Sequence, residues 1–220
     1  MDLSIFKVIG PIMIGPSSSH TAGAAKLSRV ARMIINKPFD HVSFGLHGSF
    51  AKTYKGHGTD KALVAGVLGL FEDDERIVNA FDLAHEQGVG YDFYEIHLEE
   101  AHENSVKITF SLDGSETGEV IGSSLGGGLI MINSINGFET EVTAQLTTLV
   151  ISQKDKPGII SRVSGILAEN GINIGTMKVS RQGRGESACC IIETDSPVTQ
   201  EALRQIENVK HVNSVQLIPV

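Results

Sequence analysis

The sequence contains no tryptophan and only two cysteines in 220 residues, and aromatic side chains make up 5% of it. The cysteines are neighbours, Cys189 and Cys190. Adjacent side chains on a strand point to opposite faces, so we expect no disulfide between them. The pair is typical of core packing in a reducing cytoplasm. Two thiolates are also too few for an iron–sulfur cluster, which normally takes four, so we expect no metal ligands in this chain.

Long apolar runs and an excess of basic charge are missing as well. The longest apolar stretch, Ala62–Phe71, spans ten residues and contains glycine, whereas a membrane helix needs about 20. Residues 1–7 lack a basic region followed by an apolar core, so no secretory signal is expected. The net charge is −8, and residues 1–147 alone carry −9. Without a basic stripe, nucleic acid is not expected as a partner, and the chain is predicted to be cytoplasmic and free of membranes.

Residues 147–220 predict a regular alternation of strands and helices. Leu149–Ser152 is a short apolar run typical of a strand, and the apolar spacing over 159–167 predicts a helix. We expect Asp155 or Lys156 at the cap of that helix and Pro157 in its first turn. Three more elements follow the Asn170-Gly171 stop signal, namely strands over Ile172–Ser180 and Ser187–Thr194 and a helix over 197–207, before a last strand over His211–Ile218. This β-α-β-β-α-β order is the ferredoxin-like plan.

Residues 1–146 predict a less regular α/β domain, which makes the whole chain α+β. We place the domain boundary near 141–146. Apolar spacing predicts helices over 24–34, 59–70 and 73–87, with Thr59-Asp60 as the cap of the second. Strands are expected over 40–46, 91–98 and 106–112, the last two paired with each other. A glycine-rich loop is expected over Gly122–Gly128, before a strand over 129–132.

The residue types most typical of chemistry stand at the start of the first helix, in Gly15–Thr21. N–H groups at a helix start bind anions, and Ser17, Ser18 and Ser19 add hydroxyl donors. His20 adds a group that carries a proton near neutral pH. Such a site suits a small carboxylate with reactive chemistry beside it. The alternative is an elaborate helix cap, because serine and threonine are good caps.

Two further stretches can share this site. Leu46–Thr53 contains His47 and Ser49, and Gly56–Lys61 places His57 between two glycines, where backbone can approach a ligand closely. The glycine-rich loop can supply further N–H donors.

Metal binding is the competing interpretation of the histidines. His57 lies three residues before Asp60, and His97 and His102 lie among the four glutamates of 95–103. Neither spacing matches a zinc signature, and the acidic segment is typical of a solvated strand end.

The segment Asp155–Ile159 together with Asn170–Ile174 resembles the ACT domain, an amino-acid-sensing module of metabolic enzymes. The resemblance implies a homodimer with an effector site between paired copies. It places that site at Lys156, Pro157, Gly158, Asn170 and Asn173. The domain can alternatively serve only as a dimerisation surface.

Gly15–Thr21, Leu46–Ser49 and Gly56–Asp60 resemble the beta chains of bacterial iron–sulfur-dependent L-serine dehydratases. With the ACT-like tail, the resemblance covers the whole chain. It implies that residues 1–146 form an allosteric-substrate-binding-like domain, which also occurs as a regulatory insert in some phosphoglycerate dehydrogenases. It also implies a separate cysteine-rich alpha chain that holds a [4Fe-4S] cluster. The heterooligomer is then a lyase of amino-acid catabolism and gluconeogenesis that converts L-serine to pyruvate and ammonia, and the isolated chain is inactive.

The same resemblance implies the roles of individual residues. In that family an incompletely ligated iron coordinates the serine hydroxyl and carboxylate as a Lewis acid, while a base removes the α-proton. His57 and His20 are the candidates for proton transfer or substrate orientation, with His57 preferred as the base. Substrate binding falls to Ser17, Ser18, Ser19, Thr21, His47, Ser49, Gly58 and Thr59. Two alternatives remain, a serine-binding regulatory module without catalysis and an isolated metal hydrolase.

Overall fold

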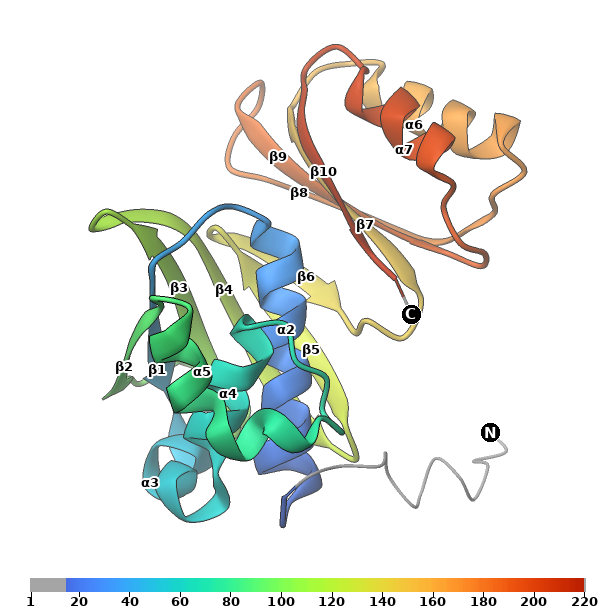
Figure 1. Ribbon diagram of the computed structural model, residues 1–220. Helices are drawn as coiled ribbons and strands as arrows, with labels where there is room; N and C mark the ends of the chain where they lie inside the picture. The colour runs from blue at the N-terminus through green and yellow to red at the C-terminus, as the bar shows by residue number, and fades with distance from the viewer. Residues whose placement is uncertain (1–14, 220) are drawn as a thin grey trace. The chain divides into compact units, whose positions relative to one another are not determined.

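The computed structural model describes residues 15–219, so the segment considered for a secretory signal lies outside it. The chain divides between Gly137 and Phe138 into two compact units, each described by itself below (Figure 1). Within the described range, no helix is long and apolar enough to cross a membrane.

The first unit contains a mixed sheet with the strand order β2-β1-β3-β4-β5. β1 pairs with β2 in parallel and with β3 antiparallel. The prediction that the segments now seen as β2 and β3 pair with each other is wrong, because β1 lies between them. Parallel neighbours require a long crossover, and the helices between β1 and β2 supply it. The strands are β1 (His41–Leu46), β2 (Gly90–Glu95), β3 (Ser105–Leu112), β4 (Ser115–Gly126) and β5 (Leu129–Ile135).

Helices cover one face of this sheet (Figure 1). They are the π-helical turn η1 (Ser18–Gly23), α2 (Ala24–Ile35), α3 (Gly48–His57), α4 (Thr59–Val67), the 3₁₀ turn η2 (Glu75–Asn79) and α5 (Ala80–Glu86). The sequence did not predict α3. The expected helix over 73–87 is instead split into η2 and α5, and the Asp74 side chain caps η2 by accepting from the Arg76 N–H at 2.9 Å.

Glycines let α2 approach both of its neighbours closely. A Cβ added to Gly66 of α4 would lie 2.2 Å from the carbonyl oxygen of Ala25, and one added to Gly122 of β4 would lie 2.7 Å from Leu27 Cδ1. Real Cβ atoms do not approach other atoms so closely, so α2 fits between α4 and β4 only because these positions lack side chains. Leu27 and Leu63 are fully buried in the resulting core.

Two different turns close the ends of β4. Asp113 and Gly114, with φ of 50° and 75°, join β3 to β4 as expected for a two-residue hairpin turn. At the other end, Gly126, Gly127 and Gly128 all have positive φ and join β4 to β5. Residues 122–126 therefore belong to a strand, and only the last part of the predicted glycine loop is a turn.

The strand register places several loops at the end of the sheet marked by the turn Gly126–Gly128. Leu46, the last residue of β1, is paired with Glu95 at the end of β2 and with Val106 near the start of β3. Ser105 in turn is paired with Ser123 near the end of β4. We call this end the glycine-turn end of the sheet. The segments that follow β1 and β2 and precede β3 all lie there.

The second unit confirms the predicted ferredoxin-like order. Its sheet has the order β10-β7-β9-β8, and α6 and α7 cover one face, where Leu149, Val163 and Ile206 pack in one core. The elements are β6 (Phe138–Val142), which precedes the repeat, β7 (Thr147–Lys154), α6 (Ile159–Glu169), β8 (Ile174–Arg181), β9 (Ser187–Thr194), α7 (Gln200–Glu207) and β10 (Val212–Ile218).

The predicted start of α6 requires a correction. Gly158, with φ of 89°, is its cap residue, and Pro157 lies in the turn before it. Asp155 does not cap the helix, because its carboxylate accepts from the Gly185 N–H at 3.1 Å. A left-handed backbone at the helix entrance favours glycine, and this constraint is not visible in the apolar pattern.

Candidate active site

Two imidazoles converge in the first unit. The ring centroids of His20 and His57 lie 4.8 Å apart with an angle of 38° between the planes. His20 comes from η1. His57 is the last residue of α3 and also lies just before α4, the helix start that the sequence predicted after it. Gly58, with φ of 68°, turns the chain directly into α4.

Hydroxyl groups hold the His20 ring at both of its nitrogens. Ser19 Oγ lies 3.1 Å from Nδ1, and Ser49 Oγ lies 3.2 Å from Nε2. Ser17 Oγ accepts from the His20 backbone N–H at 3.0 Å and so caps η1. Desolvation by burial lowers the pKa of His20, and the nearby His57 lowers it further. The neutral ring is therefore favoured at neutral pH.

The His57 ring has a different arrangement. Its Nδ1 lies 3.4 Å from the carbonyl oxygen of Thr53. A carbonyl only accepts hydrogen bonds, so we assign the proton to Nδ1 and the lone pair to Nε2. Thr21 Oγ1 donates to the His57 carbonyl oxygen at 3.1 Å and ties this helix end to η1. His57 thus presents a nitrogen that can accept a proton.

The end of β4 lies beside the serine run, as the sequence predicted for the glycine-rich segment. Ser18 Oγ accepts from the Gly127 N–H at 3.3 Å, and Ser124 Oγ donates to the Ser19 carbonyl oxygen at 2.9 Å. A Cβ on Gly23 would lie 1.9 Å from Ser124 Oγ. Only glycine at this position lets η1 lie on β4.

Two predicted substrate-binding residues have other surroundings. His47 Nδ1 accepts from the Leu98 N–H at 3.2 Å, and its ring lies edge-on to His97 at 5.5 Å, so its contacts are with the segment after β2. Thr59 is fully buried, and its hydroxyl has no hydrogen-bond partner. Its side chain therefore does not cap α4, for which Gly58 is the cap residue.

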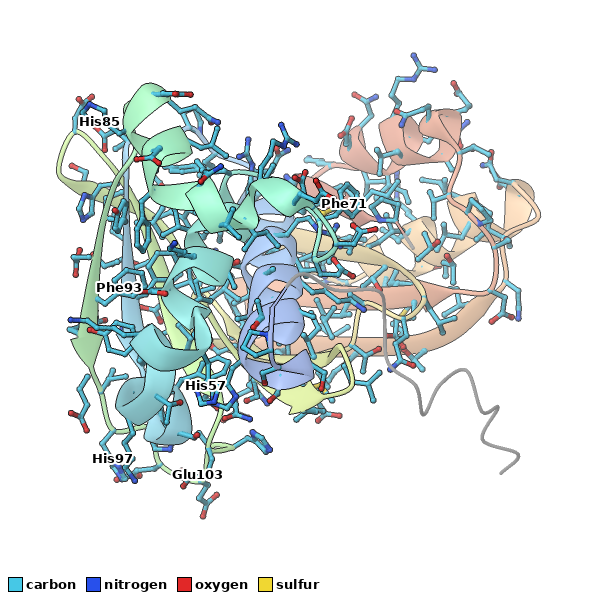
Figure 2. The ribbon with its side chains drawn as sticks, turned by 60° about the horizontal axis from the view of Figure 1, so that its bottom comes forward. His57, Phe71, His85, Phe93, His97 and Glu103 are labelled. Atoms are coloured by element: carbon cyan, nitrogen blue, oxygen red, sulfur yellow. The ribbon has the colours of Figure 1, made fainter. Side chains whose placement is uncertain are left out.

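The start of α3 is closed by the protein itself. The Glu103 carbonyl oxygen accepts from the Ser49 N–H at 2.7 Å and from the Phe50 N–H at 3.4 Å. These N–H groups are consequently not open to an anion. Figure 2 shows Glu103 and His97 at the same end of the unit as His57, with Phe71 and His85 at the other end.

Asn104 is a polar residue near the site that sequence reasoning missed. Its carbonyl oxygen accepts from the Ser124 N–H at 2.9 Å, and Ser105 is paired with Ser123. Asn104 thus lies beside Ser124, whose own hydroxyl donates to the carbonyl oxygen of Ser19 in η1. The Oδ1 of Asn104 is buried without a hydrogen-bond partner. No motif marks Asn104, and its place follows only from the register.

The described residues contain no group of three or more His, Cys, Asp and Glu side chains that could hold a metal ion. Cys189 and Cys190 are buried on β9, and burial raises the pKa of their thiols to about 11 and about 12. Thiols with such values are protonated near neutral pH and are poor metal ligands. The part of the chain that the structure describes therefore does not fit an iron–sulfur cluster.

The predicted effector residues of the second unit lie at the two ends of α6. Lys156, Pro157 and Gly158 precede it. Asn170 follows it, and its Nδ2 donates to Gln205 Oε1 at 3.1 Å, whereas Asn173 Nδ2 donates to Asp195. An 11-residue helix is about 16 Å long. Within one chain these two groups therefore do not form one site.

Two family descriptions match the sequence, "Serine dehydratase beta chain" over residues 4–81 and "ACT domain" over residues 147–211. "L-serine dehydratase, beta chain" of Peptoniphilus asaccharolyticus is 42% identical over 220 residues, covering 100% of this chain and 99% of that protein. "Probable L-serine dehydratase, beta chain" of Bacillus subtilis (strain 168) is 40% identical, with 98% and 97% covered. A D-3-phosphoglycerate dehydrogenase of B. subtilis is 29% identical over 89% of this chain but 37% of its own length.

Proposed function

The chain belongs to the family of serine dehydratase beta chains, and from that premise we propose that its imidazole pair handles the substrate proton in the conversion of L-serine to pyruvate and ammonia. The reaction is an α,β-elimination in which the α-proton and the hydroxyl group leave serine. The aminoacrylate formed then tautomerises and hydrolyses. The single observation that supports this assignment is the 4.8 Å separation of the His20 and His57 rings beside the serine run.

His57 is the general base in this proposal. Its Nδ1 faces the Thr53 carbonyl oxygen, which leaves the lone pair on Nε2 to accept the α-proton. The hydroxyls of Ser19 and Ser49 lie beside both ring nitrogens of His20, which suits His20 for orienting the substrate. A positioned base contributes roughly 10²–10⁴-fold to a rate.

The serine run and Asn104 bind the substrate in this proposal. Ser17, Ser18 and Ser19, with the N–H groups at the start of η1, suit the carboxylate of L-serine, because donors at a helix start attract anions. The unpartnered Oδ1 of Asn104 is an acceptor and suits the ammonium group. Thr21, Ser49 and Gly58 are proposed to bind the substrate as well, and the contacts of Thr21 and Ser49 also hold the two imidazoles in place.

We assign the [4Fe-4S] cluster to the alpha chain, since the described residues here do not fit it. In this proposal the chain is one subunit of a cytoplasmic heterooligomer and is inactive alone. We also propose that the ACT domain forms a homodimer. An amino acid then binds between copies at Lys156, Pro157 and Gly158 of one and Asn170 and Asn173 of the other, because α6 separates these groups within one chain.

Co-expression with the cognate alpha chain under anaerobic conditions, followed by a serine-to-pyruvate assay, tests this function. Replacing His57 by alanine is expected to lower turnover about a hundredfold or more, because the base is lost. The control is His85→Ala on α5, an exposed histidine at the other end of the unit (Figure 2), which should keep wild-type turnover. Turnover of His57→Ala within a few-fold of wild type rejects the role of base.

A second function, regulation by serine binding without catalysis, is favoured by one observation. The chain is similar over 89% of its length to a D-3-phosphoglycerate dehydrogenase, of which it covers only a part. Under this alternative the chain alone binds L-serine, and changes at His20 or His57 leave the activity of its partner unchanged. Calorimetry with L-serine and the assay above distinguish the two.

A further inference from the structure

Two exposed leucines flank the turn Gly126–Gly128. Leu125 is 46% exposed and Leu129 is 45% exposed. The turn borders the imidazole site, because the Gly127 N–H donates to Ser18 Oγ. Exposed large apolar side chains that border a site are candidates for an interface. The leucines therefore form an apolar rim on the β4–β5 side of the site.

An acidic segment borders the other side of the site. Residues 95–103 contain four glutamates, all exposed, and no lysine or arginine. The segment begins at the end of β2 and finishes at Glu103, whose carbonyl oxygen accepts from the Ser49 N–H. Because β2 and β5 lie on opposite sides of β1, β3 and β4, the acidic segment and the leucine rim lie on opposite sides of the imidazole pair.

A chain that brings the cluster to this site approaches between these two borders. We infer that the glycine-turn end of the sheet is the docking surface for the dehydratase alpha chain. Leu125 and Leu129 insert into an apolar part of that chain, and the 95–103 segment faces basic residues on it. The inference rests on the proposed function, in which the cluster lies on the alpha chain and the proton-accepting imidazole on this one.

The affinity of the full-length chain for its cognate alpha chain, measured anaerobically by biolayer interferometry, tests the leucine rim. Leu125→Lys and Leu129→Lys are each expected to weaken binding at least tenfold, since a charge then replaces an apolar anchor. Val78→Lys is the matched control, because Val78 is 50% exposed on η2 in the same unit, and it should bind as wild type. Circular dichroism checks the fold of each variant, and Leu125→Ser repeats the test without a charge.

The rate of association with the alpha chain tests the acidic segment. The double change Glu99→Gln and Glu100→Gln is expected to lower the association rate several-fold and to flatten its dependence on salt, because opposite charges steer two surfaces together. Leucine variants that bind like Val78→Lys overturn the inference while leaving the proposed function intact. If the wild-type chain does not bind the alpha chain at all, both the inference and the proposed function fail.

Discussion

The two histidines of the site have different hydrogen-bonding partners. Both nitrogens of His20 face hydroxyls, which donate or accept equally well, so this ring keeps its place in either tautomer. His57 faces a backbone carbonyl, which fixes one tautomer. The serine run and the glycines around His57 allowed the pair to be predicted. The different proposed roles of the two rings depend on their contacts with Ser49 and Thr53. No sequence motif predicts which ring each of these residues contacts.

The lowered pKa of His20 gives the free energy of unfolding a defined pH dependence. Unfolded His20 binds a proton as the pH falls through its ordinary pKa of about 6.5, whereas the folded ring binds one only at lower pH. The free energy of unfolding therefore decreases as the pH falls. Denaturant titrations from pH 8 to pH 5 should therefore show wild type losing stability relative to His20→Gln. A constant difference between the two proteins over this range would contradict the assigned shift.

Asn104 is expected to control substrate affinity rather than turnover. Asn104→Ala removes the acceptor for the ammonium group and should raise KM for L-serine about tenfold with little change in kcat, a loss within the range of one hydrogen bond to a charged group. Steady-state kinetics of the assembled enzyme measure both constants. Asn208→Ala on the surface of the second unit is the control. A fall in kcat at constant KM would exclude this role.

At the scale of elements, glycine decides how closely α2 and α4 pack. Gly66→Ala is expected to lower the free energy of unfolding by about 1–3 kcal/mol, because its methyl group meets the Ala25 carbonyl oxygen. Gly56→Ala in α3 has open space around its Cβ, and should raise the free energy of unfolding by roughly 0.5–1 kcal/mol. Urea denaturation of both variants measures the contrast. Equal changes in the free energy of unfolding for the two variants would show that α2 and α4 are not tightly packed at Gly66.

The elements that the sequence predicted well are those with strong local signals. The second unit was predicted in its correct order because its apolar periods are separated by clear stop signals such as Asn170-Gly171. In the first unit, α3 was missed because Phe50 is its only buried side chain, which leaves little periodicity. The pairing of β2 was mispredicted because its neighbour β1 is more than 40 residues earlier in the chain, and local patterns carry no information about such distant partners.

On the scale of the whole molecule, the features tied to the proposed chemistry belong to one unit. The imidazole pair, the serine run and the glycine turn all lie in the first unit, whereas the second has its own core around Leu149 and Ile206. The family match to the first unit and the ACT match to the second fall on either side of the division. In the proposed function, catalysis thereby belongs to the first unit and effector binding to the second.

The Asp113-Gly114 hairpin turn lies at the opposite end of the sheet from the imidazoles, and a Cβ on Gly114 would meet no atom within 4 Å. This position is suited to an inserted affinity tag or a fluorescent label. A reporter placed there can follow assembly with the alpha chain in real time without obstructing the proposed docking surface.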